Sequence, residues 1–274
     1  MGNKLVEWLS KLTTSSQEPT PDILLISFTV VNAFLVGDPN NKEEGWVLVD
    51  TGLENSADFI LKSVEKRFGK DSKPQAIILT HGHFDHVGSV KKLIELWNVP
   101  VYAHKLEMPY ITGEKDYPLP DPTVDEGMVA KMSPSFPHSS IDISSSVKPL
   151  PDDGTVPGMP DWKWIHTPGH AEGHVALFRE KDRALIAGDA FSTTKQESLT
   201  SVITQDEQIS GPPKYLTTDW LAAEESVRTL MELKPSLAMT SHGKPMEGEE
   251  LIKHLEMLVK EFDEIAKPEQ GRFV

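Results

Sequence analysis

Three histidines and one aspartate are crowded into the stretch T-H-G-H-F-D-H-V-G, which covers residues 80–88. An apolar run at residues 76–79 precedes this stretch, and a segment with helical spacing follows it. A strand that leads through a short loop into a helix would hold the four side chains on one rim. The four residues are His81, His83, Asp85 and His86. Because imidazole nitrogen and carboxylate oxygen suit zinc, iron or manganese, the stretch predicts a metal site without thiolate ligands.

The same stretch resembles the H-x-H-x-D-H signature of the metallo-β-lactamase-fold hydrolases. In that superfamily the remaining ligands are a distant histidine, a bridging aspartate and a final histidine, each at the end of a later strand. This chain has matching residues in His170 of T-P-G-H, Asp189 of A-G-D-A and His242 of T-S-H-G. Each of the three follows an apolar run, so the order of strand and then ligand recurs four times, over roughly residues 20 to 265.

The resemblance implies two divalent metal ions, with zinc as the expected metal and iron or manganese as alternatives. The seven implied ligands divide between the ions, with His81, His83 and His170 on one, Asp85, His86 and His242 on the other, and Asp189 bridging both. Metal ions can lower the pKa of a bound water to about 7. The resemblance therefore implies a dinuclear metallohydrolase in which a metal-bridging hydroxide attacks an acyl carbon. Asp85 and Asp189 are the implied catalytic residues, and Asp85 or a metal-bound water would pass a proton to the leaving group.

The bridging aspartate and the T-P-G-H sequence resemble the glyoxalase II-like branch most closely. Thioesterases of that branch hold glutathione through basic and tyrosyl residues of an additional C-terminal helical region, which we cannot identify in this sequence. Lactone-cleaving relatives share the seven ligands, so the predicted substrate is an ester, a thioester or a lactone. Two alternatives remain open. One is a glyoxalase II-like persulfide dioxygenase with a single iron ion, and the other is a non-catalytic metal-binding protein that serves partner interaction.

Two further residues are candidates for holding the metal ligands in place. Asp50 follows the predicted strand at residues 46–49 and precedes a turn glycine. Such an aspartate often only caps a strand, whereas in the resembled family it lies beneath the metal loop and orients it by hydrogen bonding. His174 lies four residues after His170, so it either supports a ligand or packs in the core. Hydrogen-bonding partners of this kind fix the tautomer and tilt of ligating histidines.

The composition argues against several kinds of partner and chemistry. The 274-residue chain has a net charge of −15 and a pI near 5.1, which disfavours partners bound through phosphates. It contains no cysteine, so disulfides, thiolate ligands and a thiol nucleophile are excluded. We therefore expect a small-molecule substrate, no nucleic acid and a cytoplasmic location. The sequence leaves the oligomeric state open.

Residues 1–20 form a separate segment before the predicted domain. Leu5, Trp8, Leu9 and Leu12 match helical spacing, so the segment is either an amphipathic helix or a frayed end. It lacks the uninterrupted apolar stretch of a signal peptide. No run approaches the roughly 18 apolar residues that a membrane span requires, so no membrane association is expected.

Apolar periodicity predicts an α/β fold in which strands and helices alternate in both halves of the chain. The predicted strands cover residues 23–31, 34–36, 46–49, 76–79, 99–103, 162–165, 175–178, 184–186 and 237–239. The predicted helices cover residues 56–68 and 87–97, and two more begin near Asp219 and Glu249, the last with an apolar stripe to Ile265. Two sheets faced by helices give a four-layer αββα sandwich, the metallo-β-lactamase fold, with the metal site at a sheet edge. This fold would occupy residues 21–268 as one domain.

Residues 105–160 form a proline-rich insertion within this domain. Its ten prolines interrupt the periodicity that marks the rest of the chain. Long loops inside compact domains are usually functional or disordered. Because the insertion lies between the first metal motif and T-P-G-H, part of it is predicted to form a lid or pocket wall, with Tyr110, Tyr117 and Phe136 among the residues that would contact a substrate. The alternative is an ordered wrap over core strands.

Overall fold

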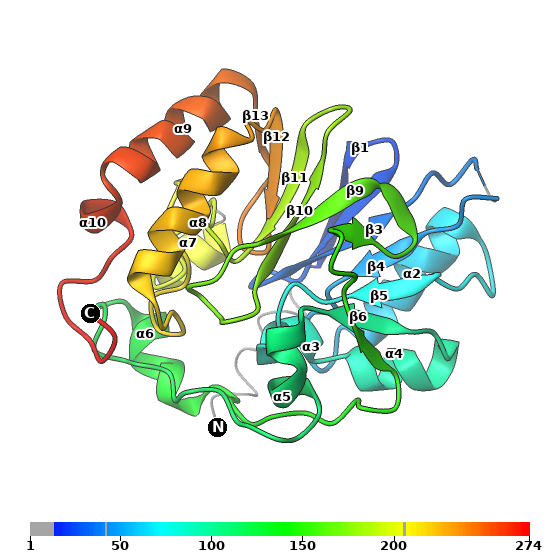
Figure 1. Cartoon of the computed structure of the whole chain (residues 1–274), viewed down its shortest axis with the longest axis horizontal. Coiled ribbons are helices and arrows are strands. Elements are labelled where there is room, and N and C mark those ends of the chain that lie inside the picture. Colours follow the sequence, from blue (N-terminus) through cyan, green and yellow to red (C-terminus); the bar gives the residue numbers. More distant parts are fainter. Residues whose placement is uncertain (1–13, 42, 205–206) are drawn as a thin grey trace. The chain divides into compact units, whose positions relative to one another are not determined.

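The computed structural model describes residues 14–41, 43–204 and 207–274, and within them the chain divides into two compact units. The N-terminal unit contains residues 14–117 and 139–160, and the C-terminal unit contains residues 118–138 and 161–274. Each unit has a β-sheet with helices packed against it (Figure 1). Each thus supplies one sheet layer and one helix layer of the predicted αββα arrangement. The predicted N-terminal helix, as far as Leu12, lies outside the described residues.

The sheet of the N-terminal unit has seven strands in sequence order, β1-β2-β3-β4-β5-β6-β7. The strands are β1 (Ser15–Thr20), β2 (Ile23–Ser27), β3 (Asn32–Val36), β4 (Val47–Val49), β5 (Ala76–Ile78), β6 (Val101–Ala103) and β7 (Val147–Pro149). Strands β1 to β4 pair antiparallel, and β4 to β7 pair parallel. The parallel strands end at one edge, and the loop after β5 carries the first metal motif.

Two helices, α2 (Ala57–Phe68) and α4 (Val90–Trp97), pack on this sheet, as the periodicity predicted. Trp46, directly before β4, joins both helices to the sheet. Its ring stacks on Phe68 of α2 with 4.8 Å between ring centroids, and it meets Trp97 of α4 edge to face at 5.8 Å. Aromatic pairs of this kind contribute about 0.5–1.5 kcal/mol beyond the burial of their area. The short helix α3 (Phe84–Val87) lies within the metal motif.

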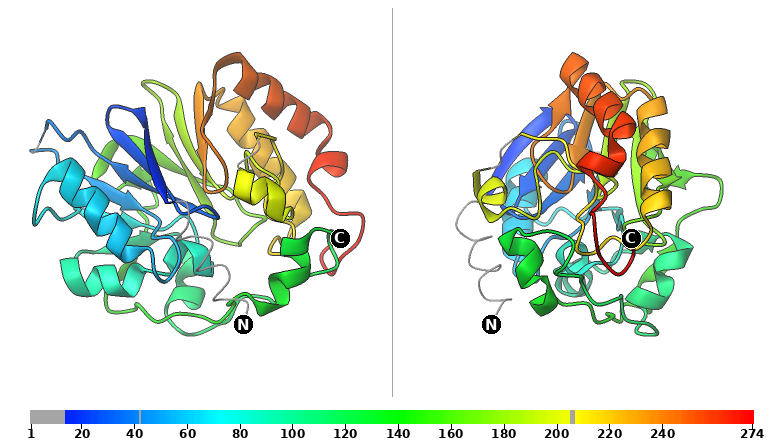
Figure 2. Two further views of the ribbon diagram at one scale, coloured as in Figure 1. Left: turned by 180° about the vertical axis from the view of Figure 1, so that it is seen from behind. Right: turned by 90° about the vertical axis from the view of Figure 1, so that its left-hand side faces the viewer.

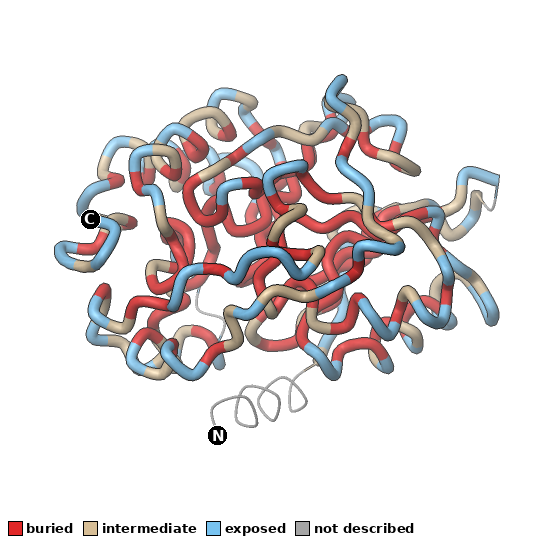
Figure 3. The backbone as a smooth tube through the Cα atoms, turned by 60° about the horizontal axis from the view of Figure 1, so that its bottom comes forward, coloured by how far each residue is buried: buried red, intermediate tan, exposed pale blue. Residues whose placement is uncertain are grey.

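The second sheet has six strands in the order β13-β12-β11-β10-β9-β8. The strands are β8 (Thr155–Val156), β9 (Met159–His166), β10 (Val175–Arg179), β11 (Ala184–Gly188), β12 (Leu237–Thr240) and β13 (Met246–Glu247). Strands β11 and β12 are parallel, so their carboxyl ends lie at the same edge. Every residue of β10 and β11 is buried, which explains why β11 and residues 175–178 of β10 are apolar without alternation. Figure 3 shows the buried stretches of the backbone in red.

Helices α8 (Trp220–Glu232) and α9 (Gly248–Lys260) pack on this second sheet, beside β12 and β13 (Figure 2). The Asp219 carboxylate accepts a hydrogen bond from the Ala222 N–H at 3.0 Å, so the predicted helix start at Asp219 is confirmed. The inward faces of the two helices bury Leu230 and Leu255, among others. Burying one such side chain contributes about 1.5–3 kcal/mol. Among the described residues of the C-terminal unit, the shorter α-helices are α6 (Met128–Met132), α7 (Leu199–Thr204) and α10 (Phe262–Ile265).

Three features of the backbone differ from the sequence predictions. Strand β1 was not predicted, because Ser15–Thr20 has few apolar residues and is ordered by its pairing with β2. The predicted strand at residues 23–31 is wrong beyond Ser27, because Thr29 has a φ of 70° and turns the chain back into β3. The predicted last helix is broken at Glu261, which periodicity could not reveal because the apolar stripe continues across the break.

The proline-rich segment contains short ordered elements rather than one long loop. These are η1 (Lys105–Glu107), α5 (Met108–Ile111), α6, η2 (Ser133–Ser135), β7 and β8. Its residues are divided between the two units, because residues 118–138 belong to the C-terminal unit and the rest to the N-terminal unit. Tyr110, Tyr117 and Phe136 are all buried. Of the helices in the described part of the chain, none has both the length and the apolar content needed to cross a membrane.

Candidate functional site

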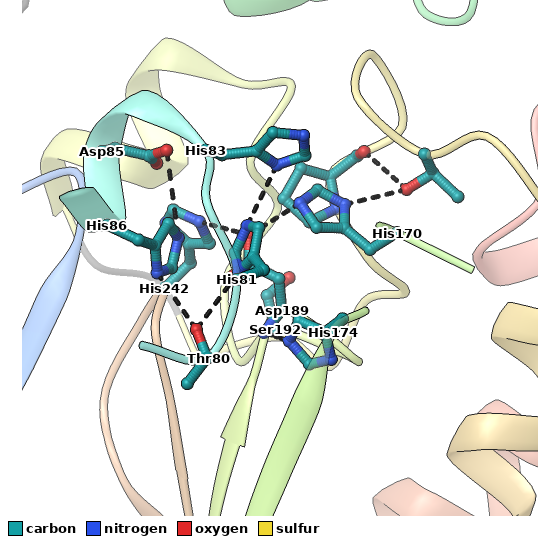
Figure 4. A network of polar contacts seen from close by, with 12 residues as sticks. Thr80, His81, His83, Asp85, His86, His170, His174, Asp189, Ser192 and His242 are labelled. Carbon is teal, nitrogen blue, oxygen red and sulfur yellow. Dashed lines mark hydrogen bonds and ion pairs between the residues drawn. The ribbon is translucent and has the colours of Figure 1, made fainter. Parts of the chain in front are cut away.

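The N-terminal unit brings together the four candidate ligands of the first motif (Figure 4). All four side chains are buried where the chain passes from β5 into α3. His81 Nε2 lies 3.0 Å from His83 Nδ1, and the His81 and His86 rings are 4.0 Å apart between centroids. Asp85 Oδ1 lies 3.9 Å from His86 Nε2. A dense motif in the sequence is therefore a dense cluster of nitrogen and oxygen donors in space.

Asp50 lies beneath this cluster, at the end of β4. Its carboxylate is fully buried and accepts three hydrogen bonds at 2.8 Å, from the backbone N–H and the hydroxyl of Thr80 and from His86 Nδ1. Asp50 has a φ of 57°, a left-handed conformation that aspartate tolerates better than most residues. The neighbouring Thr51 donates two hydrogen bonds, from its N–H and its hydroxyl, to the His86 carbonyl at 2.7 Å. These contacts fix both the ring and the backbone of His86.

The hydrogen bonds also determine which ring nitrogen carries the proton. An ionised carboxylate only accepts, so Asp50 requires a proton on Nδ1 of His86. The Thr80 hydroxyl donates to Asp50, so its oxygen accepts from Nδ1 of His81, 3.1 Å away. In both rings Nε2 is left as the nitrogen that can bind a metal ion. Thr80 was not among the predicted support residues, although it stands beside His81 in the motif.

The C-terminal unit brings together the other three candidate ligands, which lie in the loops after β9, β11 and β12 (Figure 4). Asp189 Oδ2 lies 3.2 Å from His170 Nε2 and 3.0 Å from His242 Nε2. All three side chains are buried. One carboxylate oxygen therefore lies between two imidazoles, which is the geometry expected of a residue shared by two binding positions.

Gly169 explains the T-P-G-H sequence. Its φ is 128°, and a Cβ at this position would lie 2.4 Å from the backbone nitrogen of Ala223 in α8. The Gly169 carbonyl accepts hydrogen bonds from the backbone N–H groups of Thr218 and Asp219 at 3.0 Å. Only glycine allows the loop to pack this closely on the start of α8, so Gly169 fixes the position from which His170 projects.

Thr217 orients His170 and was missed by the sequence analysis. Its hydroxyl donates to the Pro213 carbonyl at 2.8 Å, so its oxygen accepts from Nδ1 of His170 at 3.2 Å. This again leaves Nε2 as the ligand nitrogen. The two residues are 47 positions apart, and nothing in the local sequence distinguishes Thr217 from other threonines.

Replacing Thr217 by valine is expected to weaken metal binding about tenfold, the lower end of the effect typical for partners of ligating histidines. Valine keeps the shape of the side chain but cannot accept from His170. Zinc affinity, measured by competition with a chelator, checks this expectation. Thr218→Val, at the adjacent position, is the matched control. Equal affinities of the two variants would show that the Thr217 hydroxyl does not support the ligand.

His174 contacts the backbone of a candidate ligand. Its Nε2 accepts a hydrogen bond from the Asp189 N–H at 2.8 Å, so the ring proton is on Nδ1, next to the Thr167 hydroxyl at 2.8 Å and the Thr167 carbonyl at 3.1 Å. Of the two alternatives left open by the sequence, this contact favours support of Asp189. His174 is fully buried, so it also fills space in the core.

Taken together, the two clusters offer five imidazoles and two carboxylates, all of them buried. This donor set suits a divalent ion such as zinc, iron or manganese and contains no thiolate. The partners on Nδ1 of His81, His86 and His170 are all oxygens, as is usual for histidines that bind metal through their other nitrogen.

Comparison with known proteins gives matches along most of the chain. The sequence matches the family model described as "Metallo-beta-lactamase superfamily" over residues 26–242. Probable metallo-hydrolase YflN of Bacillus subtilis (strain 168) is 44% identical over 240 residues, which is 88% of this chain and 90% of that protein. Among solved structures, TTHA1623 in a di-iron-bound form has a TM-score of 0.57 and 24% identity, with 90% of this chain and 97% of that chain covered.

A match to a hydroxyacylglutathione hydrolase, the glyoxalase II activity, is more limited. The enzyme of Francisella tularensis subsp. novicida (strain U112) is 29% identical over 116 residues, which is 42% of this chain and 33% of that protein. The match leaves out most of that enzyme, so it does not establish the resemblance to the glyoxalase II-like branch.

Proposed function

The chain belongs to the metallo-β-lactamase superfamily and has its fold, and from this premise we propose that it cleaves an ester, thioester or lactone of a small molecule. Relatedness to a probable metallo-hydrolase over 88% of the chain supports metal-dependent hydrolysis. The buried donor set supports it independently. A glyoxalase II-like thioesterase is one form of this proposal, and the partial match to a hydroxyacylglutathione hydrolase favours testing thioesters first.

The observation that carries the proposal is the position of Asp189 between two imidazoles. Its Oδ2 atom is 3.2 Å from His170 and 3.0 Å from His242. Ligands of one ion must lie close to one another, and an oxygen shared by two ions needs ligands of both ions beside it; the imidazoles on either side of Asp189 Oδ2 meet this requirement. Under this proposal one ion is held by His81, His83 and His170, the other by Asp85, His86 and His242, and Asp189 is shared by both, as the family resemblance implies.

When bound, the two ions supply a hydroxide nucleophile near neutral pH and positive charge opposite the acyl oxygen. The protein's own residues hold and orient this chemistry. Asp50 and Thr217 contact Nδ1 of His86 and His170, which leaves Nε2 of each ring for a metal ion, and His174 holds the backbone of Asp189. No serine or cysteine nucleophile is required, since the nucleophile comes from water.

Asp85 is the residue proposed to move a proton to the leaving group. Its side chain is 11% exposed, against 2% for Asp189, so it is the proposed catalytic carboxylate with the better access to solvent and substrate. It also lies 3.9 Å from His86 Nε2, within reach of the same ion. Asp189 is proposed to act through its charge, which it would share between the ions.

The first test is metal stoichiometry. Protein purified without added metal salts is expected to contain two divalent ions per chain, with zinc as the proposed metal and iron or manganese as alternatives. Elemental analysis measures the content, and a panel of thioesters, lactones, β-lactams and phosphodiesters measures the activity. One ion per chain, unchanged in a His242→Ala variant, would contradict the dinuclear proposal. Metal content without turnover of any substrate would favour a non-catalytic metal-binding protein.

The proposed setting of the reaction follows from the composition. A net charge of −15 argues against a nucleic-acid substrate, so the phosphodiesters in the substrate panel are expected not to be cleaved. The proposed location is the cytoplasm.

A further inference from the structure

Gly82 lies between the candidate ligands His81 and His83, and its backbone N–H is held by two side chains of the proline-rich segment. The N–H donates to Glu107 Oε2 at 2.8 Å and to the Tyr117 hydroxyl at 3.0 Å. The Tyr117 hydroxyl in turn donates to the same Glu107 oxygen. Gly82, Glu107 and Tyr117 are thus linked pairwise by hydrogen bonds, and all three residues are buried within the N-terminal unit.

The packing around Gly82 is equally close. A Cβ at this position would lie 2.6 Å from the Tyr117 hydroxyl and 2.8 Å from Ile111 Cγ2, so no side chain fits there. Glu107 and Tyr117 therefore pack directly against the backbone between His81 and His83. Because the peptide unit is planar, holding this N–H fixes the plane of the peptide bond between His81 and Gly82 and so restricts the backbone that carries the two histidines.

Tyr117 also contacts a candidate ligand through its ring. The centroids of the Tyr117 and His83 rings are 4.4 Å apart, and Tyr110 stacks on Tyr117 at 4.1 Å with an angle of 9° between the rings. Burial and then the neighbouring Glu107 carboxylate raise the pKa of Tyr117 well above its ordinary value, so its hydroxyl keeps the proton that it donates. The ring of His83 is thus packed against a rigid stack.

We infer that Glu107 and Tyr117 are positioning residues for the His81 and His83 ligands, and that they couple folding of the proline-rich segment to metal affinity. Burying a carboxylate is costly unless it receives hydrogen bonds, and Glu107 receives one from the metal loop and one from Tyr117. This gives Tyr117 a role different from the substrate contact predicted from the sequence. The inference rests on the metal site of the proposed function.

The experiment measures zinc affinity of the metal-depleted full-length chain by competition with a chelator, beside the thermal unfolding of the same metal-free protein. Tyr117→Phe removes only the hydroxyl, and Glu107→Leu removes both acceptor oxygens. Glu107→Gln keeps an acceptor oxygen and tests whether hydrogen bonding rather than charge is required. Glu197→Leu is the matched control, because Glu197 is a buried carboxylate of the C-terminal unit that accepts a backbone hydrogen bond from Lys214 at 2.9 Å.

We expect Tyr117→Phe and Glu107→Leu each to weaken zinc binding about 10- to 100-fold, as is typical when a partner of a metal ligand is lost. Glu107→Gln should retain most of the affinity. Glu197→Leu should lower thermal stability but leave zinc affinity unchanged. The double variant Tyr117→Phe/Glu107→Leu should bind zinc only slightly less tightly than the single variant with the lower zinc affinity. Both residues act on the same N–H group, so their effects should not add.

Wild-type zinc affinity in Tyr117→Phe and Glu107→Leu, with or without a loss of thermal stability, would overturn the inference and leave the proposed function standing. A loss of affinity in Glu197→Leu equal to that in Glu107→Leu would also overturn it, because the effect would then follow from general destabilisation. A wild-type chain that binds no zinc, iron or manganese would instead refute the metal site itself.

Discussion

His242→Ala is expected to lower the rate of ester or thioester hydrolysis about a hundredfold to a thousandfold, the usual effect of losing one contact that stabilises developing negative charge. The variant removes an imidazole whose Nε2 lies 3.0 Å from Asp189, and so weakens one of the two proposed metal positions. Asp189→Asn should have at least as large an effect. The amide preserves the shape of the side chain but removes the charge that both positions would share.

The measurement is turnover of the best substrate by the wild type and both variants, under air and under nitrogen. His166→Ala is the matched control, because His166 is an exposed histidine whose Nε2 contacts the Glu172 carbonyl, outside both ligand clusters. It should retain wild-type activity. Hydrolysis should proceed equally with and without oxygen. Turnover that demands oxygen, survives His242→Ala and tracks one iron per chain would favour the persulfide dioxygenase alternative.

Asp50→Ala is expected to destabilise the metal-free protein and to weaken metal binding as well. The substitution leaves the Thr80 N–H, the Thr80 hydroxyl and the His86 ring without the acceptor that they share. Each buried donor left unsatisfied costs about 1–3 kcal/mol, so the free energy of unfolding should fall by about 3 kcal/mol or more. Zinc affinity should fall about 10- to 100-fold, because His86 loses its acceptor and the Thr80 hydroxyl, which orients His81, loses the acceptor that holds it.

Urea unfolding in the presence of a chelator measures the free energy of unfolding of the metal-free protein. Competition with a chelator for zinc measures the zinc affinity. Asp38→Ala provides the control, since Asp38 is an exposed turn residue whose carboxylate accepts a hydrogen bond from the Asn40 N–H. It should change stability by less than about 0.5 kcal/mol, as surface substitutions usually do. If Asp50→Ala behaved like Asp38→Ala in both measurements, Asp50 would be only the strand-end cap that the sequence also allowed.

The sequence by itself determined the elements whose signal is local. The four candidate ligands of residues 80–88 stand next to one another, and each later ligand follows an apolar run that is a strand in the structure. Strand β11 and residues 175–178 of β10 are apolar because both faces of these strands are buried. The start of α8 was visible because Asp219 caps it through a hydrogen bond that spans only three residues. In these cases the residues that interact are neighbours in sequence, so a pattern can record them.

Only the tertiary structure decided what holds those ligands. Thr217 reaches His170 across 47 positions, and Tyr117 reaches Gly82 across 35. A hydrogen bond between segments so far apart requires only one donor and one acceptor, and it leaves no periodicity in either segment. Strand β1 was invisible for a similar reason, because its order comes from pairing with β2. The turn at Thr29 was missed because threonine is a typical strand residue, and its positive φ is set by the hairpin that it closes. The types of the candidate metal-binding residues can thus be identified from short stretches of this sequence, whereas the orientation of their side chains depends on contacts that form only when the chain folds.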